Sequence, residues 1–69
     1  PEHAYPVGAL RLARGDYAGA AKLLAQAAEQ DPKRAGAVAA YTACRAGRAQ
    51  QARAVAGAER LPPGLRCWQ

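Results

Sequence analysis

The sequence contains no phenylalanine, methionine, isoleucine, serine or asparagine, and among its 69 residues it has one histidine, one tryptophan and two cysteines. The missing large apolar side chains limit the core, since hydrophobic residues make up 51% of the chain but most of them are alanine. An alanine removes little apolar surface from water, so an isolated domain of this composition has a thin core. We therefore expect a piece of a larger protein, which the first residue, Pro1, also favours.

The scarcity of nucleophiles and proton carriers argues against catalysis. A catalytic site needs a nucleophile, a base and an orienting group that converge in space. Here the single histidine, His3, and five acidic residues are scattered along the chain. Asp16 and Asp31 are explained as helix caps, and Glu29 and Glu59 as charges on helix faces. The sequence predicts no enzyme, no small-molecule substrate and no cofactor.

The two cysteines, Cys44 and Cys67, are too few for a metal site in a chain with one histidine. The two cysteines are either free thiols or joined to each other in a disulfide. A free buried thiol is favoured because Cys44 falls on an expected helix of a thin core. A disulfide would instead tie the C-terminal tail to that helix. The free thiol goes with a cytoplasmic location, whereas the disulfide implies a periplasmic or extracellular one.

Long hydrophobic runs are also missing. No apolar stretch approaches the roughly 18–20 residues of a membrane span, and no signal-peptide pattern is present. We expect no transmembrane segment in this chain.

What the chain has in abundance is alanine at helical spacing. Residues 17–30 carry an apolar stripe with a period of 3.6 residues, which predicts a helix packed against neighbours. The stripe consists of Tyr17, Ala20, Ala21, Leu24, Ala27 and Ala28. Gly15 is expected at positive φ after the preceding helix, with Asp16 as the N-cap of this one. Asp31 and Pro32 end it and begin another.

The remaining turn residues divide the chain into four helices. We expect them from about Pro6 or His3 to Arg14, from Tyr17 to Gln30, from Pro32 or Lys33 to Ala46, and from about Ala49 to Arg60. Residues 1–5 are a frayed end or a first turn. Gly8 indicates a close neighbour, because glycine inside a helix costs about 1 kcal/mol relative to alanine. Gly47 repeats the role of Gly15, and Arg48 is a poor N-cap. Trp68 is either an anchor for a partner or a cap that folds back over the last helix, and the second is favoured.

The two halves align with each other. Placing Gly15 on Gly47 also places Ala20 on Ala52, with a period of 32 residues (15 to 47). A period near 34 with two helices per unit is typical of one repeat family. The first unit resembles a tetratricopeptide repeat through Gly8, Gly15-Asp16-Tyr17, Ala20, Leu24, Ala27 and Asp31-Pro32. It departs from the family at Ala4 and Arg11, where a large aromatic is usual. The second unit is degenerate, with Glu59 where a small residue is expected.

This resemblance implies an all-α fold, with antiparallel helix hairpins stacked as a short right-handed solenoid. The single domain would hold unit one at about 1–32, unit two at about 33–61 and a tail at 62–69. In this family the first helix of each pair lines a concave groove. The positions carried over to this chain are Tyr5, Ala9, Leu12, Ala37, Tyr41, Cys44 and Arg45. The implied function is a protein–protein interaction module, a scaffold or adaptor of a bacterial helical array, that binds a peptide or helix of a partner.

The net charge of +5 and the pI of about 9.9 permit nucleic acid, anionic lipid or an acidic protein as partner, although arginine-rich helices can carry such charge simply to be solvated. A basic rim is expected around the groove from Arg11, Arg14 and Arg48, together with Arg45. These arginines can equally be explained as residues that solvate helix ends. Nucleic acid or anionic lipid is a less favoured partner, because no aromatic residues interleave with the arginines. The chain also resembles, loosely, a small chaperone of the type III secretion kind, and a spacer between domains is a further role that its composition permits.

Overall fold

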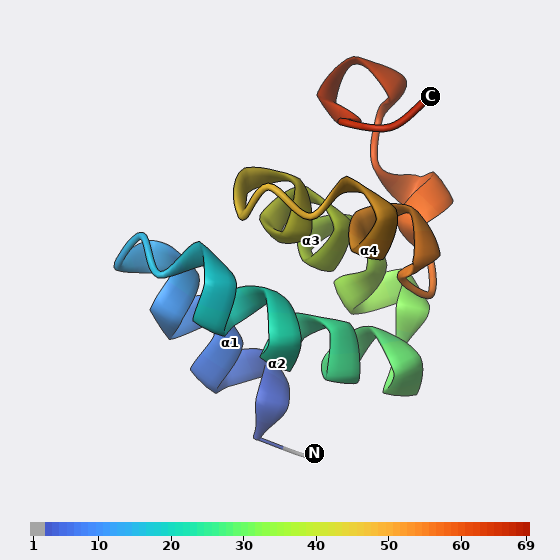
Figure 1. Cartoon of the computed structure of the whole chain (residues 1–69). Helices are drawn as coiled ribbons and strands as arrows, with labels where there is room; N and C mark the ends of the chain where they lie inside the picture. Colours follow the sequence, from blue (N-terminus) through green and yellow to red (C-terminus); the bar gives the residue numbers. More distant parts are fainter. Residues whose placement is uncertain (1–2) are drawn as a thin grey trace.

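The computed structural model describes residues 3–69, and in this range every regular element is a helix and no strand occurs (Figure 1). This confirms the predicted all-α class; the expectation for residues 1 and 2 lies outside the described range. Consecutive α-helices run in opposite directions, so both glycine turns lie at the left end of Figure 1. The elements are α1 (Ala4–Ala13), α2 (Tyr17–Gln30), α3 (Pro32–Arg45) and α4 (Ala49–Ala54), then the short 3-10 helices η1 (Ala58–Arg60) and η2 (Pro63–Leu65).

The predicted helix boundaries of the first three helices are confirmed to within a few residues. The Asp16 carboxylate accepts a hydrogen bond from the Gly19 backbone N–H at 3.0 Å. The Asp31 carboxylate accepts a hydrogen bond from the Arg34 backbone N–H at 3.2 Å. Each cap satisfies one of the backbone donors that a helix N-terminus leaves without a partner. Gly15 and Gly47 adopt φ of 80° and 76°, as their shared role requires.

The core is built from the predicted alanine stripe of α2, which packs against both α1 and α3. Leu24, at 0% exposure, is the largest apolar side chain fully inside. Small side chains let the helices approach closely, and this compensates in part for the low apolar area of each residue. We call this group the first cluster: Ala4, Ala20, Leu24, Ala27, Ala28, Ala35 and Ala39.

Gly8 marks a close contact between α1 and α2, as the sequence predicts. A Cβ added to it would lie 2.8 Å from Leu24 Cγ and 3.2 Å from Leu23 Cβ. Both distances are shorter than ordinary van der Waals contact. Glycine is therefore needed here for helix packing rather than for a turn.

The expected extent of α4 is wrong. The helix ends at Ala54 instead of Arg60, because Val55 is extended and Gly57 adopts a left-handed φ of 84°. The cause is a backbone contact across the fold: a Cβ on Gly36 of α3 would lie 2.7 Å from the Ala56 carbonyl oxygen. A continuous helix would not bring this segment onto α3. Arg48 provides no side-chain cap to α4, as predicted.

The expectation of a free thiol at Cys44 is also wrong, because Cys44 and Cys67 form a disulfide with a Cα–Cα distance of 5.6 Å. The tail reaches Cys44 because it turns back at η2. Arg66 fixes this turn by donating from Nε to the Leu61 carbonyl and from Nη2 to the Glu59 carbonyl, both at 2.8 Å. Figure 1 places the tail at the end of the molecule opposite α1.

The prediction for Trp68 is confirmed, since its half-buried side chain covers two small groups of buried residues. The second cluster consists of Ala21, Ala43 and Ala52, and the third of Ala40, Ala58 and Leu61. Trp68 therefore covers apolar surface of α3, α4 and η1 that the helices of residues 3–69 leave partly open.

Candidate functional site

The expected groove residues of α1 are half-buried rather than fully exposed. Tyr5 and Leu12 pack against the first cluster, and Ala9 lies between them in sequence. Part of each side chain remains accessible, while the rest contributes to the core. The most exposed large apolar residues of α1 are Val7 and Leu10, at 40% and 51% exposure, which the family resemblance does not place in the groove.

The expected groove residues of α3 divide into two kinds. Ala37 and Tyr41 are half-buried and pack against the third cluster. Arg45 is exposed at the end of the helix. Cys44 is withdrawn from the expected groove, because it is bonded to Cys67 and packs against the second cluster. What α3 presents is therefore a tyrosine and an arginine beside small apolar residues.

Two arginines of α3 reach across to tyrosines of the first hairpin. The guanidinium carbon of Arg34 lies 4.3 Å from the ring centroid of Tyr5 on α1. That of Arg45 lies 4.9 Å from the ring centroid of Tyr17, the first residue of α2. Both distances are within the range in which a cation is attracted to an aromatic face. These contacts join α3 to the first hairpin near both ends of α3.

Tyr41 connects to the second of these pairs. Its hydroxyl accepts a hydrogen bond from Arg45 Nη1, one helical turn further along α3, at 3.4 Å. Arg45 is thus held by an aromatic face and by a hydroxyl, which restricts its rotamers. We call the surface formed by Tyr5, Tyr17, Arg34, Tyr41 and Arg45 the arginine–tyrosine face.

The arginines expected in the basic rim differ in their surroundings. Arg14 and Arg48 are exposed, each next to one of the glycine turns. Arg11 instead forms a salt bridge with Asp16, with Nη1 and Oδ2 3.1 Å apart. The Gly19 backbone N–H, followed by the Arg11 guanidinium, holds the pKa of the Asp16 carboxyl below its ordinary value. The positive charge of Arg11 is therefore already matched within the chain.

Sequence reasoning misses Arg34 and Tyr17 as members of this surface. Helical periodicity assigns Tyr17 to the core stripe, but it is half-buried and presents a ring face to Arg45. The sequence does contain a pattern that could have placed Arg34 on this surface. It precedes Arg45 by eleven residues, close to three helical turns, so both occupy one face of α3.

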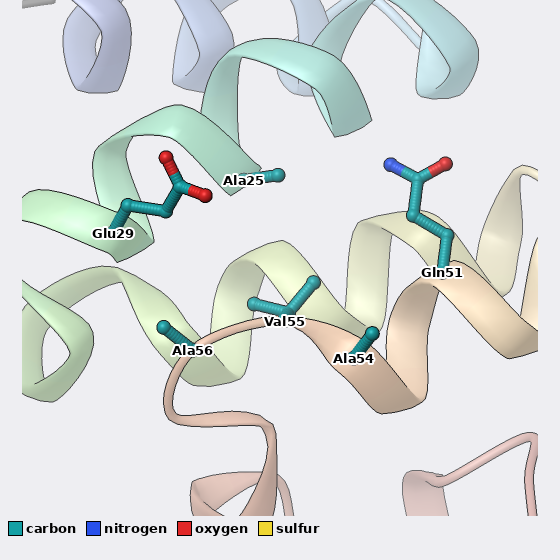
Figure 2. A pocket seen from close by; sticks show the side chains of 6 residues that line it. All are labelled: Ala25, Glu29, Gln51, Ala54, Val55 and Ala56. Atoms are coloured by element: carbon teal, nitrogen blue, oxygen red, sulfur yellow. The ribbon is translucent and has the colours of Figure 1, made fainter.

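A small pocket lies away from this face, between α2 and the end of α4 (Figure 2). Glu29 and Gln51 flank it, and Val55 lies between them. Its volume of about 130 Å³ is well below the roughly 300–1,000 Å³ typical of small-molecule sites. The pocket adjoins the point where α4 ends early, and its lining is Ala25, Glu29, Gln51, Ala54, Val55 and Ala56.

Residues 3–69 hold no group of three or more histidine, cysteine or acidic side chains placed to bind a metal ion. In the same range, no helix has both the length and the apolar character that crossing a bilayer requires.

Comparison with known proteins assigns the chain to no family. No family model, curated protein or solved structure matches the chain. The case for a function therefore rests on the residues and contacts of the chain itself.

Proposed function

We propose that the chain is a non-catalytic protein-interaction module of tetratricopeptide type, in which α1 and α3 line a surface that binds a peptide or helix of a partner. The observation that carries this proposal is the pair of arginine–tyrosine contacts that join α3 to the first hairpin, Arg34 with Tyr5 and Arg45 with Tyr17. Aromatic and arginine side chains are enriched where proteins bind each other.

Three further features support the proposal. The consecutive helices are antiparallel, and both hairpin turns use a glycine at positive φ, thirty-two residues apart. The surface residues Ala9, Ala37 and Tyr41 are only half-buried, so they remain accessible to a partner. Trp68 packs against the same third cluster as Ala37 and Tyr41, and the disulfide ties the tail to α3, so the tail gives this surface a fixed border.

The disulfide bears on where this module works. Disulfides persist in oxidising compartments and are reduced in the cytosol. With Cys44 and Cys67 bonded, a periplasmic or extracellular location is favoured over the cytoplasmic one that a free thiol would have favoured.

The test is affinity capture from a lysate of the source organism, with the oxidised chain as bait. The groove variant is Tyr41→Ala/Arg45→Ala. The matched control is Arg53→Ala, which removes one exposed charge from α4, outside the proposed surface. Circular dichroism must show equal helicity for all baits, since Tyr41 also packs against the third cluster.

A protein retained by the wild type and by Arg53→Ala but lost by the groove variant supports the proposal. Equal recovery on all three baits overturns the groove and leaves a spacer. Recovery of nucleic acid that added salt removes would instead favour a basic surface that binds phosphates.

A further inference from the structure

The arginine–tyrosine face displays two guanidiniums on one side of α3. Because a helix rises about 1.5 Å per residue, the offset of eleven positions from Arg34 to Arg45 places their backbones roughly 16 Å apart along the axis. Each guanidinium is held over a tyrosine ring, Tyr5 or Tyr17. Two cationic groups with restricted rotamers are therefore presented at a fixed spacing.

Attraction of a guanidinium to a ring is a cation–π interaction and does not need its N–H donors. The five N–H donors of arginine lie in the guanidinium plane and match a carboxylate in a bidentate arrangement. Within residues 3–69, the Arg34 guanidinium makes no hydrogen bond, and Arg45 makes one, at 3.4 Å, to Tyr41. Nearly all these donors are available to a ligand. A guanidinium already ordered by its neighbours loses less conformational entropy when it binds.

Within residues 3–69, Asp31 and Asp16 are engaged elsewhere, and neither Glu29 nor Glu59 forms an ion pair with Arg34 or Arg45. Asp31 caps α3 at the Arg34 backbone N–H. Asp16 caps α2 and pairs with Arg11. The face therefore has two cations without matching anions from the described part of the chain, in a protein of net charge +5.

We infer that this face binds an acidic segment of a partner protein, with one carboxylate at Arg34 and a second at Arg45. The inference rests on the proposed function and specifies its ligand. At about 3.3 Å per residue, an extended segment spans the distance between the arginines with acidic residues about five positions apart.

An acidic protein segment fits this face better than nucleic acid. Single-stranded nucleic acid is held by bases that stack on open aromatic faces along a continuous basic groove. Here the guanidiniums of Arg34 and Arg45 cover one face of Tyr5 and of Tyr17. Tyr5 also packs against the first cluster, which leaves little ring surface for a base.

The test measures fluorescence anisotropy of two labelled synthetic peptides of equal length and composition. The spaced peptide carries two aspartate–glutamate pairs five positions apart, and the clustered peptide carries the same four residues together. A labelled single-stranded DNA of equal charge is the third probe. We expect the spaced peptide to bind the wild type at least about fivefold more tightly than either of these comparison probes.

Two matched variants distinguish recognition by the planar guanidinium from attraction by positive charge alone. Arg34→Lys/Arg45→Lys keeps the net charge but removes the planar fork, and it should weaken binding of the spaced peptide by about fivefold or more. Arg14→Ala/Arg48→Ala removes two charges outside the face and should weaken it less. Equal binding by the lysine variant, losses that follow net charge alone, or tighter binding of the clustered peptide or the DNA would each overturn the inference.

The inference can be wrong while the proposed function is right, and one result distinguishes the two cases. If a captured partner is lost from Tyr41→Ala/Arg45→Ala but still binds Arg34→Lys/Arg45→Lys at full strength, the interaction surface stands and the carboxylate recognition is wrong.

Discussion

Gly36 and Gly57 lie in backbone contact, and this contact determines where α4 stops. A Cβ on Gly36 would lie 2.7 Å from Gly57 Cα, and a Cβ on Gly57 would meet the Pro32 carbonyl oxygen of the same helix. The segment after Ala54 thus crosses α3 at a distance that side chains do not permit. Because Gly57 also has a φ of 84°, two separate requirements favour glycine there.

Gly36→Ala should destabilise the fold by about 2 kcal/mol, within the usual range for an overpacked core. The added methyl group meets backbone atoms of Ala56 and Gly57, which cannot rotate away. The gain in helix propensity from alanine, at most about 1 kcal/mol, offsets only part of this. Urea unfolding followed by circular dichroism measures the loss.

Gly64→Ala is the matched control for that substitution. A Cβ at Gly64 has nothing within 4 Å, and its φ is not in the left-handed region. It should leave stability unchanged or raise it by up to about 1 kcal/mol. If both variants lost the same stability, the backbone contact would not be the cause.

Removing the disulfide with Cys44→Ala/Cys67→Ala should lower stability by about 3 kcal/mol, since the bond closes a loop with a sequence separation of 23 residues. For a domain of this size the Tm should fall by more than about 10 °C. A dithiol reductant should shift the wild type by a similar amount and leave the double variant unchanged. A reductant effect on the double variant would point to a cause other than this bond.

Stability should also depend on the ionisation of Asp16. Its pKa is lowered in the folded state, first by the Gly19 backbone N–H and then by Arg11. The stabilisation is therefore complete above the unfolded-state pKa of about 4, and it is lost as the pH falls through the lower folded-state value.

The measurement is the stability difference between the wild type and Asp16→Asn as a function of pH. Asparagine retains an N-cap acceptor but carries no charge. The wild type should be the more stable at neutral pH, and the difference should shrink as the pH falls below about 4. Arg11→Gln should keep part of this pH dependence, because the Gly19 hydrogen bond remains. A pH-independent difference would rule out the carboxylate as its source.

The sequence predicts those features that depend on neighbouring residues. The caps at Asp16 and Asp31 and the turns at Gly15 and Gly47 follow from local backbone requirements, and the stripe of α2 follows from helical periodicity. The close contact at Gly8 is predicted correctly because a helix interior offers glycine few other reasons to be present.

The features that sequence reasoning misses depend on contacts between distant segments. Apolar residues at 52, 55 and 56 continue a helical pattern, whereas in the structure α4 ends early where Gly57 adopts a left-handed φ and its segment meets Gly36. The disulfide requires the tail to turn back at Arg66. The pairing of Arg34 with Tyr5 depends on how α1 and α3 are each placed against α2, which periodicity within one helix does not encode.

Arg66 and the disulfide should act together in holding the tail. Arg66 donates two charge-assisted hydrogen bonds to backbone carbonyls. Because the residue is only half-buried, water weakens both bonds, so Arg66→Ala should lower the free energy of unfolding by about 1–2 kcal/mol. It should also shift Trp68 fluorescence to longer wavelength, because the indole leaves the second and third clusters.

In the Cys44→Ala/Cys67→Ala background, Arg66→Ala should cost less than it does in the wild type. Without the covalent tie the tail is released more often, so the hydrogen bonds of Arg66 form for less of the time. A double-mutant cycle on the free energy of unfolding measures this coupling. Arg66→Lys retains the charge but not the two-pronged donor geometry, so it should resemble the alanine variant more than the wild type. Equal costs in both backgrounds would mean that Arg66 holds the turn after η1 independently of the disulfide.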